Sequence, residues 1–240
     1  MPHRWCNSAQ IRREQIESGA DLTFNEVFKP LLVSQIKSLS PSNVLEVGAG
    51  TGHISKELSE LGFSVTAIEL STGMYGVAKD VLSLTDVRLL NCTSFNLEKS
   101  QLYEVAFSHL VAHIVDDLNE FFELVGQHLK ANSHFIFSIP HPCFYNEYKG
   151  FFGDEYNYMT PMSKTPMSKT VSFAITKDSK NKISGVPYHH RPLSEYINKL
   201  VETGFAIDGF DETYPEEDIQ LKYGAKWESP RYCVFICRKL

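Results

Sequence analysis

Three glycines and two glutamates are spaced so that together they could bind a nucleoside. The segment Asn43–Gly52 has the pattern of a buried strand that runs into a glycine-rich turn. Glu46 stands two residues before the first of these glycines, and Glu69 ends the next apolar run. Glycines let the backbone turn tightly and lie close to a ligand, and a carboxylate at the second strand end can accept from both ribose hydroxyls. The glycine spacing is G-x-G-x-G, which differs from the G-x-G-x-x-G of dinucleotide sites.

Alternating strand and helix patterns must position these residues. Strands are expected at 44–47, 64–69, 87–90, 103–108 and 135–139, with helical stripes between them, and two last strands at 205–210 and 232–236. Short alternation of this kind predicts an α/β fold: a doubly wound, mostly parallel seven-stranded sheet with helices on both faces. Ligands of such sheets bind beyond the carboxyl ends of the strands, where the glycine turn and Glu69 would both lie.

Several residues mark where helices should begin or bend. Ser71 is expected to cap a helix, Asp116 and Asp117 to open another, and Pro192 to start a third. The apolar spacing over Asp21–Leu39 predicts a helix that Pro30 kinks or splits. Residues 1 to about 20 are polar with scattered apolar positions.

The segment that follows the fifth strand breaks this pattern. Residues 140 to 190 are rich in aromatics, and they contain a duplicated pentapeptide, Thr160–Lys164 and Thr165–Lys169. Two prolines five residues apart argue against a regular helix, so residues 160 to 170 are expected to form a mobile loop. We treat residues 1–240 as one domain, in which 1–40 form an N-terminal helical segment and 141–190 an inserted, aromatic-rich lid over the substrate.

Composition narrows the function classes. The 240 residues carry a formal net charge of −6, which argues against a large nucleic-acid footprint. We find neither a run of 18 apolar residues nor the apolar core of a signal peptide, so a membrane span and secretion are not expected. The five cysteines are odd in number and form no C-x-x-C pair, which indicates a reduced, cytoplasmic protein without a metal site.

Taken together, Glu46-Val-Gly48-Ala-Gly50-Thr-Gly52 and the later Glu69 resemble the class I S-adenosylmethionine-dependent methyltransferases, whose first motif has the form E/D-x-G-x-G-x-G. The resemblance covers residues 40 to 140 well and extends to Tyr188–Tyr196. It implies S-adenosylmethionine as the cofactor. Residues that would bind it are Glu46, Gly48, Ala49, Gly50, Gly52 and His53 at the methionine portion, Glu69 at the ribose, Leu70, Met74, Cys92 and Thr93 around adenine, and Ser108.

The acceptor site is expected beneath the aromatic insert. Residues assigned to acceptor binding are Trp5, His109, Tyr145, Phe152, Tyr188 and His189. His141 and His190 flank the insert, and a neutral histidine could take a proton from a hydroxyl or amine during methylation. Two simpler interpretations stay open: His190 and Arg191 could anchor the insert to the core, and the insert could be a cap with a small core of its own.

The sequence therefore predicts an enzyme that moves a methyl group from S-adenosylmethionine to O or N of a small molecule. One alternative is a tRNA- or rRNA-modifying methyltransferase. The N/D-P-P-Y motif of nucleic-acid amino-methylating relatives is absent, with Ser108-His-Leu-Val111 in its place, but several lysines lie in and after the duplicated loop: Lys164, Lys169, Lys177, Lys180 and Lys182. Another is a catalytically inactive binding module, although such a module has no physical need for both the glycine loop and Glu69. The acceptor and the oligomeric state are left open.

Overall fold

The computed structural model describes residues 5–92, 97–98, 100–145, 147–159, 167–173, 182–223 and 226–240. Its main sheet has seven strands in the order β3-β2-β1-β4-β5-β9-β8. The strands are β1 Asn43–Val47, β2 Ser64–Ile68, β3 Arg88–Leu90, β4 Tyr103–His109, β5 Leu129–Pro140, β8 Phe205–Thr213 and β9 Tyr232–Lys239. Strand β9 is antiparallel to both of its neighbours, and the other pairs are parallel. The predicted fold class and seven strands are confirmed.

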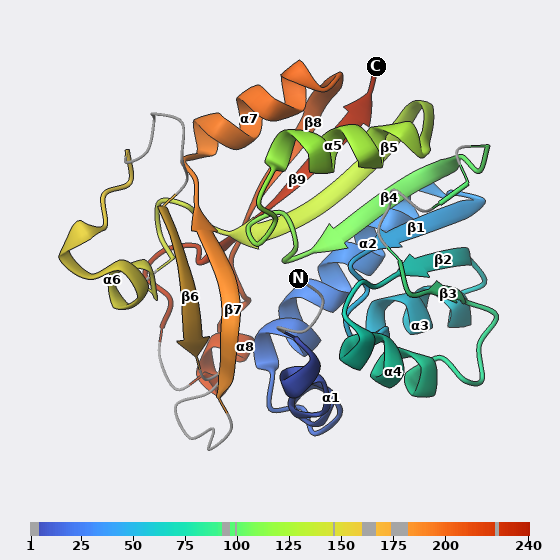
Figure 1. Ribbon diagram of the computed structural model, residues 1–240. Helices are drawn as coiled ribbons and strands as arrows, with labels where there is room; N and C mark the ends of the chain where they lie inside the picture. Colours follow the sequence, from blue (N-terminus) through green and yellow to red (C-terminus); the bar gives the residue numbers. More distant parts are fainter. Residues whose placement is uncertain are drawn as a thin grey trace.

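Helices cover both faces of this sheet (Figure 1). Alternate residues of a strand point to opposite faces, so Leu45 and Val44 enter different cores. The Leu45 core includes apolar residues of α5 Leu118–Gln127 and α7 Leu193–Glu202. The Val44 core includes those of α2 Lys29–Leu39 and α3 His53–Glu60. Burial of these two apolar layers holds the strand ends, and therefore the loops that follow them, in fixed positions.

The predicted helix starts are confirmed. Ser71 Oγ accepts from Met74 N at 3.4 Å at the start of α4 Thr72–Val81, and Asp117 Oδ1 accepts from Glu120 N at 2.9 Å at the start of α5. Pro192 immediately precedes α7. The segment 21–39 is split as expected, into a π-helical stretch, η2 Thr23–Phe28, and α2, with Pro30 in the first turn of α2.

One short helix had no bounds assigned from the sequence, and one local expectation was wrong. Residues 6–17 form η1 Cys6–Ser8 and α1 Ala9–Glu17. In α1 only Ala9, Gln15 and Ile16 are buried, so no continuous apolar stripe reveals the helix in the sequence. The second pentapeptide copy is also not wholly irregular, because Met167–Lys169 lie in strand β6 Met167–Phe173. The first copy, together with residues 165 and 166, lies outside the described residues.

The insert contains a small layered unit of its own. After α6 Glu147–Phe152 and η4 Gly153–Glu155, β6 pairs antiparallel with β7 Ile183–His190, separately from the main sheet. Its small core comprises Tyr148, Phe152, Val171, Ile183, Val186 and Tyr188. Figure 1 shows the β6–β7 hairpin and α1 on the side of the sheet to which the arrowheads of β2 and β4 point. The remaining short helix, α8 Glu217–Lys222, follows β8.

Candidate functional site

A cavity of about 820 Å³ lies at the carboxyl ends of β1, β2 and β4. Its walls come from the N-terminal helices, the glycine loop, the loop after β4, the hairpin and the start of β9. This volume is near the upper end of the range for small-molecule sites, about 300–1,000 Å³. The cavity therefore lies where the sequence predicts a ligand, and its walls differ in chemistry from one end to the other.

The glycine loop is fastened to the neighbouring strand. Gly48 N and Ala49 N both donate to Ile68 O, each at 2.9 Å, which ties the loop to the end of β2. At Gly48, φ is 79°, and a Cβ there would lie 2.5 Å from Val111 Cγ2. Only glycine therefore allows the loop after β1 to lie this close to the segment after β4.

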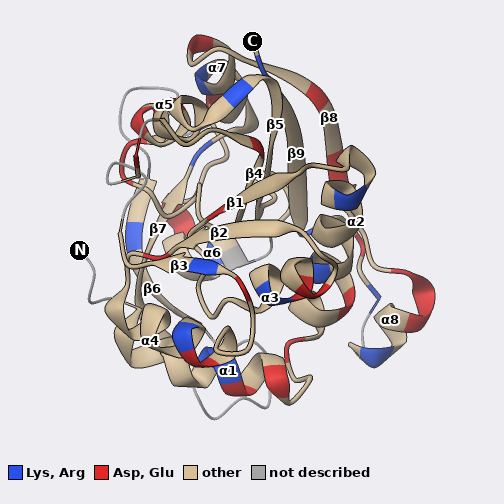
Figure 2. Cartoon of the chain, turned by 90° about the vertical axis from the view of Figure 1, so that its right-hand side faces the viewer, with Lys and Arg blue, Asp and Glu red and all other residues tan. Residues whose placement is uncertain are grey.

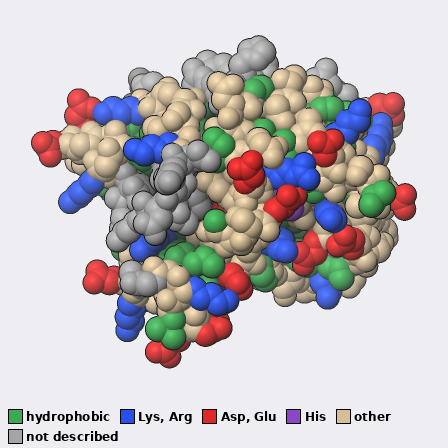
Figure 3. Space-filling view, turned by 90° about the horizontal axis from the view of Figure 1, so that it is seen from below, with side chains coloured by type: hydrophobic (Ala, Val, Ile, Leu, Met, Phe, Trp, Pro, Cys, Tyr) green, Lys and Arg blue, Asp and Glu red, His purple; other side chains and the backbone are tan. Residues whose placement is uncertain are grey.

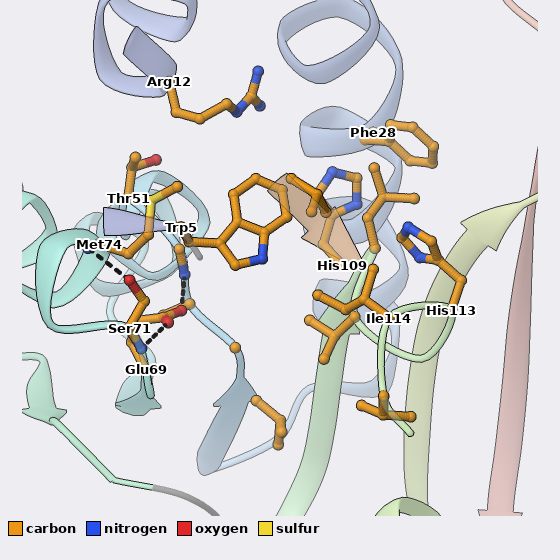
Figure 4. Close-up of a pocket in the computed structure, with 18 of the residues that line it drawn as sticks. Trp5, Arg12, Phe28, Thr51, Glu69, Ser71, Met74, His109, His113 and Ile114 are labelled. Atoms are coloured by element: carbon orange, nitrogen blue, oxygen red, sulfur yellow. Dashed lines mark hydrogen bonds between the residues drawn. The ribbon is translucent and has the colours of Figure 1, made fainter. Parts of the chain in front are cut away.

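Glu69 joins the end of β2 to the glycine loop. Its Oε2 accepts from Gly50 N at 2.8 Å and its Oε1 accepts from Ser71 N at 2.7 Å (Figure 4). Asn91 Nδ2 donates to the Glu69 carbonyl at 2.7 Å and holds the backbone in place. Burial raises the pKa of this carboxyl. Each carboxylate oxygen has a second lone pair, so Glu69 can still accept hydrogen bonds from ligand hydroxyls.

Glu46 forms the base of the cavity beneath the glycine loop. Its side chain is 2% exposed, and its Oε2 accepts a hydrogen bond from Ser55 Oγ in α3. Burial, with a smaller contribution from the nearby charge of Glu69, raises the pKa of Glu46 to about 8. A bound cationic group, such as an ammonium, would favour the ionised form of this carboxyl, which has only one hydroxyl partner and unused capacity to accept hydrogen bonds.

Aromatic rings from separate elements line the other end of the cavity. The Phe28 ring lies 4.5 Å from the His109 ring and 4.9 Å from the Tyr232 ring. The His113 and Tyr188 rings lie 4.8 Å apart. In Figure 4 the Trp5 indole projects between Glu69, Ser71 and Met74 on one side and His109, His113 and Ile114 on the other. The Trp5 side chain thus separates the aromatic wall from the end of the cavity that carries the Glu69 carboxylate.

The histidines of this wall are neutral. Burial lowers the pKa of His109 and of His113 to about 3 each. His109 Nδ1 lies 2.8 Å from Ser138 Oγ, and His53 Nδ1 lies 2.9 Å from Thr51 Oγ1. Burial also lowers the pKa of His53. All three rings can donate or accept a hydrogen bond, and the low pKa values of His109 and His113 make these two weak bases.

Most of the residues predicted for the site line this cavity. They are Trp5, Glu46, Gly48, Ala49, Gly50, His53, Glu69, Leu70, Met74, Cys92, His109, Tyr145 and Tyr188. Gly52 and Ser108 lie behind the wall: Gly52 caps α3, and Ser108 is fully buried in β4. Thr93 lies outside the described residues.

The expected placement of His141 and His190 at the acceptor requires correction. His141 is 1% exposed, and its Nε2 lies 3.0 Å from Glu212 Oε1 while its Nδ1 accepts from Cys143 N. The His190 ring is fully buried, 4.8 Å from the Tyr148 ring and away from the cavity lining. Val186, Pro187 and Tyr188 of β7 line the cavity, whereas His190, two residues farther along the strand, packs against the rings of Tyr148 and Tyr156 in the insert.

His189 and Phe152 are not among the lining residues either. His189 Nδ1 lies 2.7 Å from Ser168 Oγ, and Phe152 packs inside the core of the hairpin. The alternative in which Arg191 anchors the insert fits its contacts. This buried guanidinium donates to the carbonyl oxygens of Ala112, Val115 and Asp116, in the loop after β4.

Sequence reasoning did not assign to the site several lining residues that come from scattered segments. They are Arg12, Asp21, Phe24, Phe28, His113, Tyr223, Trp227, Arg231 and Tyr232. The sequence carries no local signal for them, since the fold alone brings these segments to one cavity. In the described part of the chain, no helix is both long and apolar enough to cross a membrane, and no three potential ligand side chains form a metal cluster.

Comparison with known proteins identifies the central segment. Residues 45–137 match the family described as methyltransferase domain. Over 144 residues the chain is 28% identical to the ubiquinone biosynthesis O-methyltransferase of Rickettsia typhi, an alignment that covers 58% of this chain and 56% of that protein. The chain thus spans a little over half the length of this curated relative.

Solved structures share the fold over nearly the whole chain. An S-adenosylmethionine-dependent methyltransferase from Clostridium acetobutylicum has a TM-score of 0.69 and 16% identity, covering 98% of this chain and 99% of its own. The 1,6-didemethyltoxoflavin-N1-methyltransferase of Burkholderia thailandensis, solved with its substrate and S-adenosylhomocysteine, has a TM-score of 0.59 and 17% identity. That alignment covers 100% of this chain and 90% of the other.

Proposed function

We propose that this chain, which belongs to the class I S-adenosylmethionine-dependent methyltransferases, transfers the methyl group of this cofactor to an O or N atom of a small molecule. The observation that carries the proposal is the hydrogen bond from Gly50 N to Glu69 Oε2, which holds the Glu69 carboxylate against the glycine loop, where it would accept from ribose hydroxyls. A cavity with an aromatic end begins at the same point and supplies a place for an acceptor.

The cofactor would be held by residues already fixed in place. Glu69 would accept from the ribose hydroxyls, and Leu70 and Met74 would lie against the adenine. The backbone of Gly48–Gly50 and the Glu46 carboxyl would hold the methionine portion, where a carboxylate suits an ammonium group. These assignments follow from the lining and from the hydrogen-bond capacity of each group.

The bound cofactor would supply an electrophilic methyl on a sulfonium, so the protein mainly has to align the acceptor and exclude water. The buried, neutral His109 and His113 suit this task as hydrogen-bond partners that orient a nucleophile. Their low pKa values argue against removal of a tightly held proton. An acceptor with an available lone pair or an acidic hydroxyl therefore fits the site best.

The N-terminal segment and the insert would close over the acceptor, and this lid role remains part of the proposal. Trp5 projects into the cavity and packs against the core of the insert, and Tyr145 and Tyr188 also line the cavity. Cys6 Sγ accepts from Gly73 N at 3.3 Å and holds the N-terminal segment against the start of α4. Exclusion of water by these segments would strengthen every polar contact with the ligands.

Methylation of tRNA or rRNA has less support. Figure 2 shows Lys and Arg interspersed with Asp and Glu on α1, α3 and α8. Figure 3 shows the same mixture from below. Lys169 Nζ lies 3.8 Å from Glu155 Oε2, and Lys164, Lys177 and Lys180 lie outside the described residues. A protein that binds the phosphates of a nucleic acid usually has a surface on which positive charge predominates. Neither view shows such a surface on the described residues.

Calorimetry tests the cofactor assignment directly. We expect S-adenosylhomocysteine to bind with micromolar affinity and NAD not to bind. Glu69→Gln, which removes one acceptor oxygen, should weaken this binding at least tenfold, since charge-assisted hydrogen bonds contribute about 1.5–3 kcal/mol each. The matched control is Glu60→Gln, on an exposed part of α3, and it should leave the affinity unchanged.

Transfer of a labelled methyl group from S-adenosylmethionine to a metabolite pool then tests the reaction itself. Transfer to extracted tRNA in place of metabolites would favour the nucleic-acid alternative. Cofactor binding with no transfer to either pool would favour a binding module. Unchanged affinity in Glu69→Gln would mean that the ribose is held elsewhere.

A further inference from the structure

Arg231 lies in the cavity wall without a carboxylate partner. Its guanidinium carbon lies 4.5 Å from the centre of the Trp227 ring, over the face of the indole. Among the described residues no acidic side chain forms an ion pair with it, although it lines the cavity. A guanidinium that lies over a ring and has no counter-ion in the described part of the chain presents its N–H donors to whatever occupies the cavity.

The position of Arg231 is fixed by the fold. It directly precedes β9, its carbonyl accepts from His141 N at 2.8 Å, and the next residue, Tyr232, pairs with Pro140 at the end of β5. Trp227 is 1% exposed, and its backbone N donates to Gln220 Oε1 at 3.0 Å. The stacked pair is therefore a rigid part of the wall.

This pair stands at the far end of the cavity from the glycine loop. Strands β4 and β5 lie between β1, which carries the loop, and β9. With neighbouring strands about 4.8 Å apart, the start of β9 is roughly 14 Å from the end of β1. Rings connect the two ends, since Phe28 contacts both His109 and Tyr232, and the Tyr232 ring lies 6.3 Å from that of Trp227.

The other arginine of the wall and three of its aspartates already have partners. Arg12 Nη1 lies 2.8 Å from Asp21 Oδ2, and Asp21 Oδ1 accepts from Phe24 N. Asp117 caps α5, and Asp116 Oδ1 lies 3.3 Å from His189 Nε2. Among the described residues that line the cavity, Arg231 is thus the cationic side chain that forms neither an ion pair nor a side-chain hydrogen bond with the rest of the protein.

We propose that the acceptor is a planar aromatic molecule bearing an anionic group, and that Arg231, stacked on Trp227, binds this group at the end of the cavity remote from the methyl donor. The inference rests on the proposed function and adds the acceptor's chemical class. The aromatic wall would stack on the body of the molecule, and the planar guanidinium would bind a carboxylate through two parallel hydrogen bonds. Arg231 is then a specificity-determining residue, outside the reacting atoms.

A pair of matched probes tests this without knowledge of the true acceptor. Naphthalene-2-carboxylate and naphthalene-2-carboxamide have the same shape and differ in charge at neutral pH. We expect calorimetry, with the protein saturated by S-adenosylhomocysteine, to show the carboxylate binding at least tenfold more tightly. In Arg231→Gln this preference should disappear through weaker carboxylate binding, while affinities for the carboxamide and for S-adenosylhomocysteine stay within twofold.

Two further variants sharpen the test. Arg231→Lys keeps the charge and loses the planar pair of donors, so it should retain part of the preference. Arg238→Gln removes an arginine that is paired with Asp208 on the surface and should retain all of it. Equal binding of the two probes, no binding of either, or a preference that survives in Arg231→Gln would overturn the inference.

The inference can fail separately from the proposed function. If S-adenosylhomocysteine binds and the probes show no dependence on Arg231, the acceptor class is wrong and the cofactor assignment stands. If S-adenosylhomocysteine does not bind, the proposed function fails, and the probes titrated alone still show whether Arg231 selects an anion.

Discussion

Replacing Glu46 by Gln should change how the stability of the protein depends on pH. The carboxyl is 2% exposed, and its pKa is raised by burial from the ordinary 4.5 to about 8. Between these values it is protonated in the folded chain and ionised in the unfolded chain. Unfolding therefore releases a proton, and this group's contribution to stability is fully present below pH 4.5 and is lost as pH rises through about 8.

The size of the effect follows from the same two pKa values. Each pH unit in this interval should lower the free energy of unfolding by about 1.4 kcal/mol, or roughly 4 kcal/mol from pH 5 to pH 8. Glutamine has nearly the same shape and does not titrate, so Glu46→Gln lacks this loss. All other groups are shared, and they cancel in the difference between the two proteins.

Urea unfolding of both proteins at several pH values, without cofactor, measures this difference. We expect the stability of Glu46→Gln relative to the natural chain to rise by roughly 4 kcal/mol from pH 5 to pH 8. The control Glu60→Gln should show no comparable slope, because the Glu60 side chain is 60% exposed and water reaches it in both states. A difference for Glu46→Gln that stays constant with pH would refute the reasoning, since the carboxyl would then be ionised in the folded protein.

Two further predictions concern the loop and the insert. Gly48→Ala should destabilise the fold by about 1–3 kcal/mol and weaken cofactor binding, because its Cβ would lie 2.5 Å from Val111 Cγ2. Gly62→Ala is the control, because φ is also positive there and no atom lies within 4 Å of the added Cβ, so only backbone strain is introduced. In thermal unfolding, Gly48→Ala should lose clearly more stability than Gly62→Ala. Arg191→Met should lower stability by about 3 kcal/mol in urea, since three carbonyl groups lose hydrogen bonds from this buried guanidinium. Arg238→Met, on the surface, should change stability much less, and equal losses in the two variants would contradict the anchoring role.

Local chemistry explains why much of the fold was predictable. The strand patterns, the caps at Ser71 and Asp117 and the helix start at Pro192 depend on residues adjacent in sequence, and all appear as expected. Helix α1 carries no apolar stripe that would mark its bounds in the sequence. Strand β6 was missed because a short polar strand is stabilised by its pairing with β7 and not by its own composition.

The cofactor end of the site was predictable from the sequence for the same reason. The glycine loop and Glu69 end consecutive parallel strands, so any such sheet brings them to the same edge, and the contact of Gly50 with Glu69 follows from the topology. The acceptor end depends on segments that are far apart in the chain. Arg12, Phe28, His113, Trp227 and Arg231 meet only after two layers of helices have packed on the sheet.

Side-chain direction and burial were also decided by the tertiary structure. His141 and His190 are chemically capable bases, yet one is turned toward Glu212 and the other into the core of the hairpin. The tertiary structure likewise decides which charged groups form ion pairs. Arg12 pairs with Asp21, whereas Arg231 lies over the Trp227 indole and not beside a carboxylate. The sequence by itself thus determined the sheet and the nucleoside end of the cavity. Packing determined which side chains reach the acceptor, because long-range burial sets the direction and ionisation of each group.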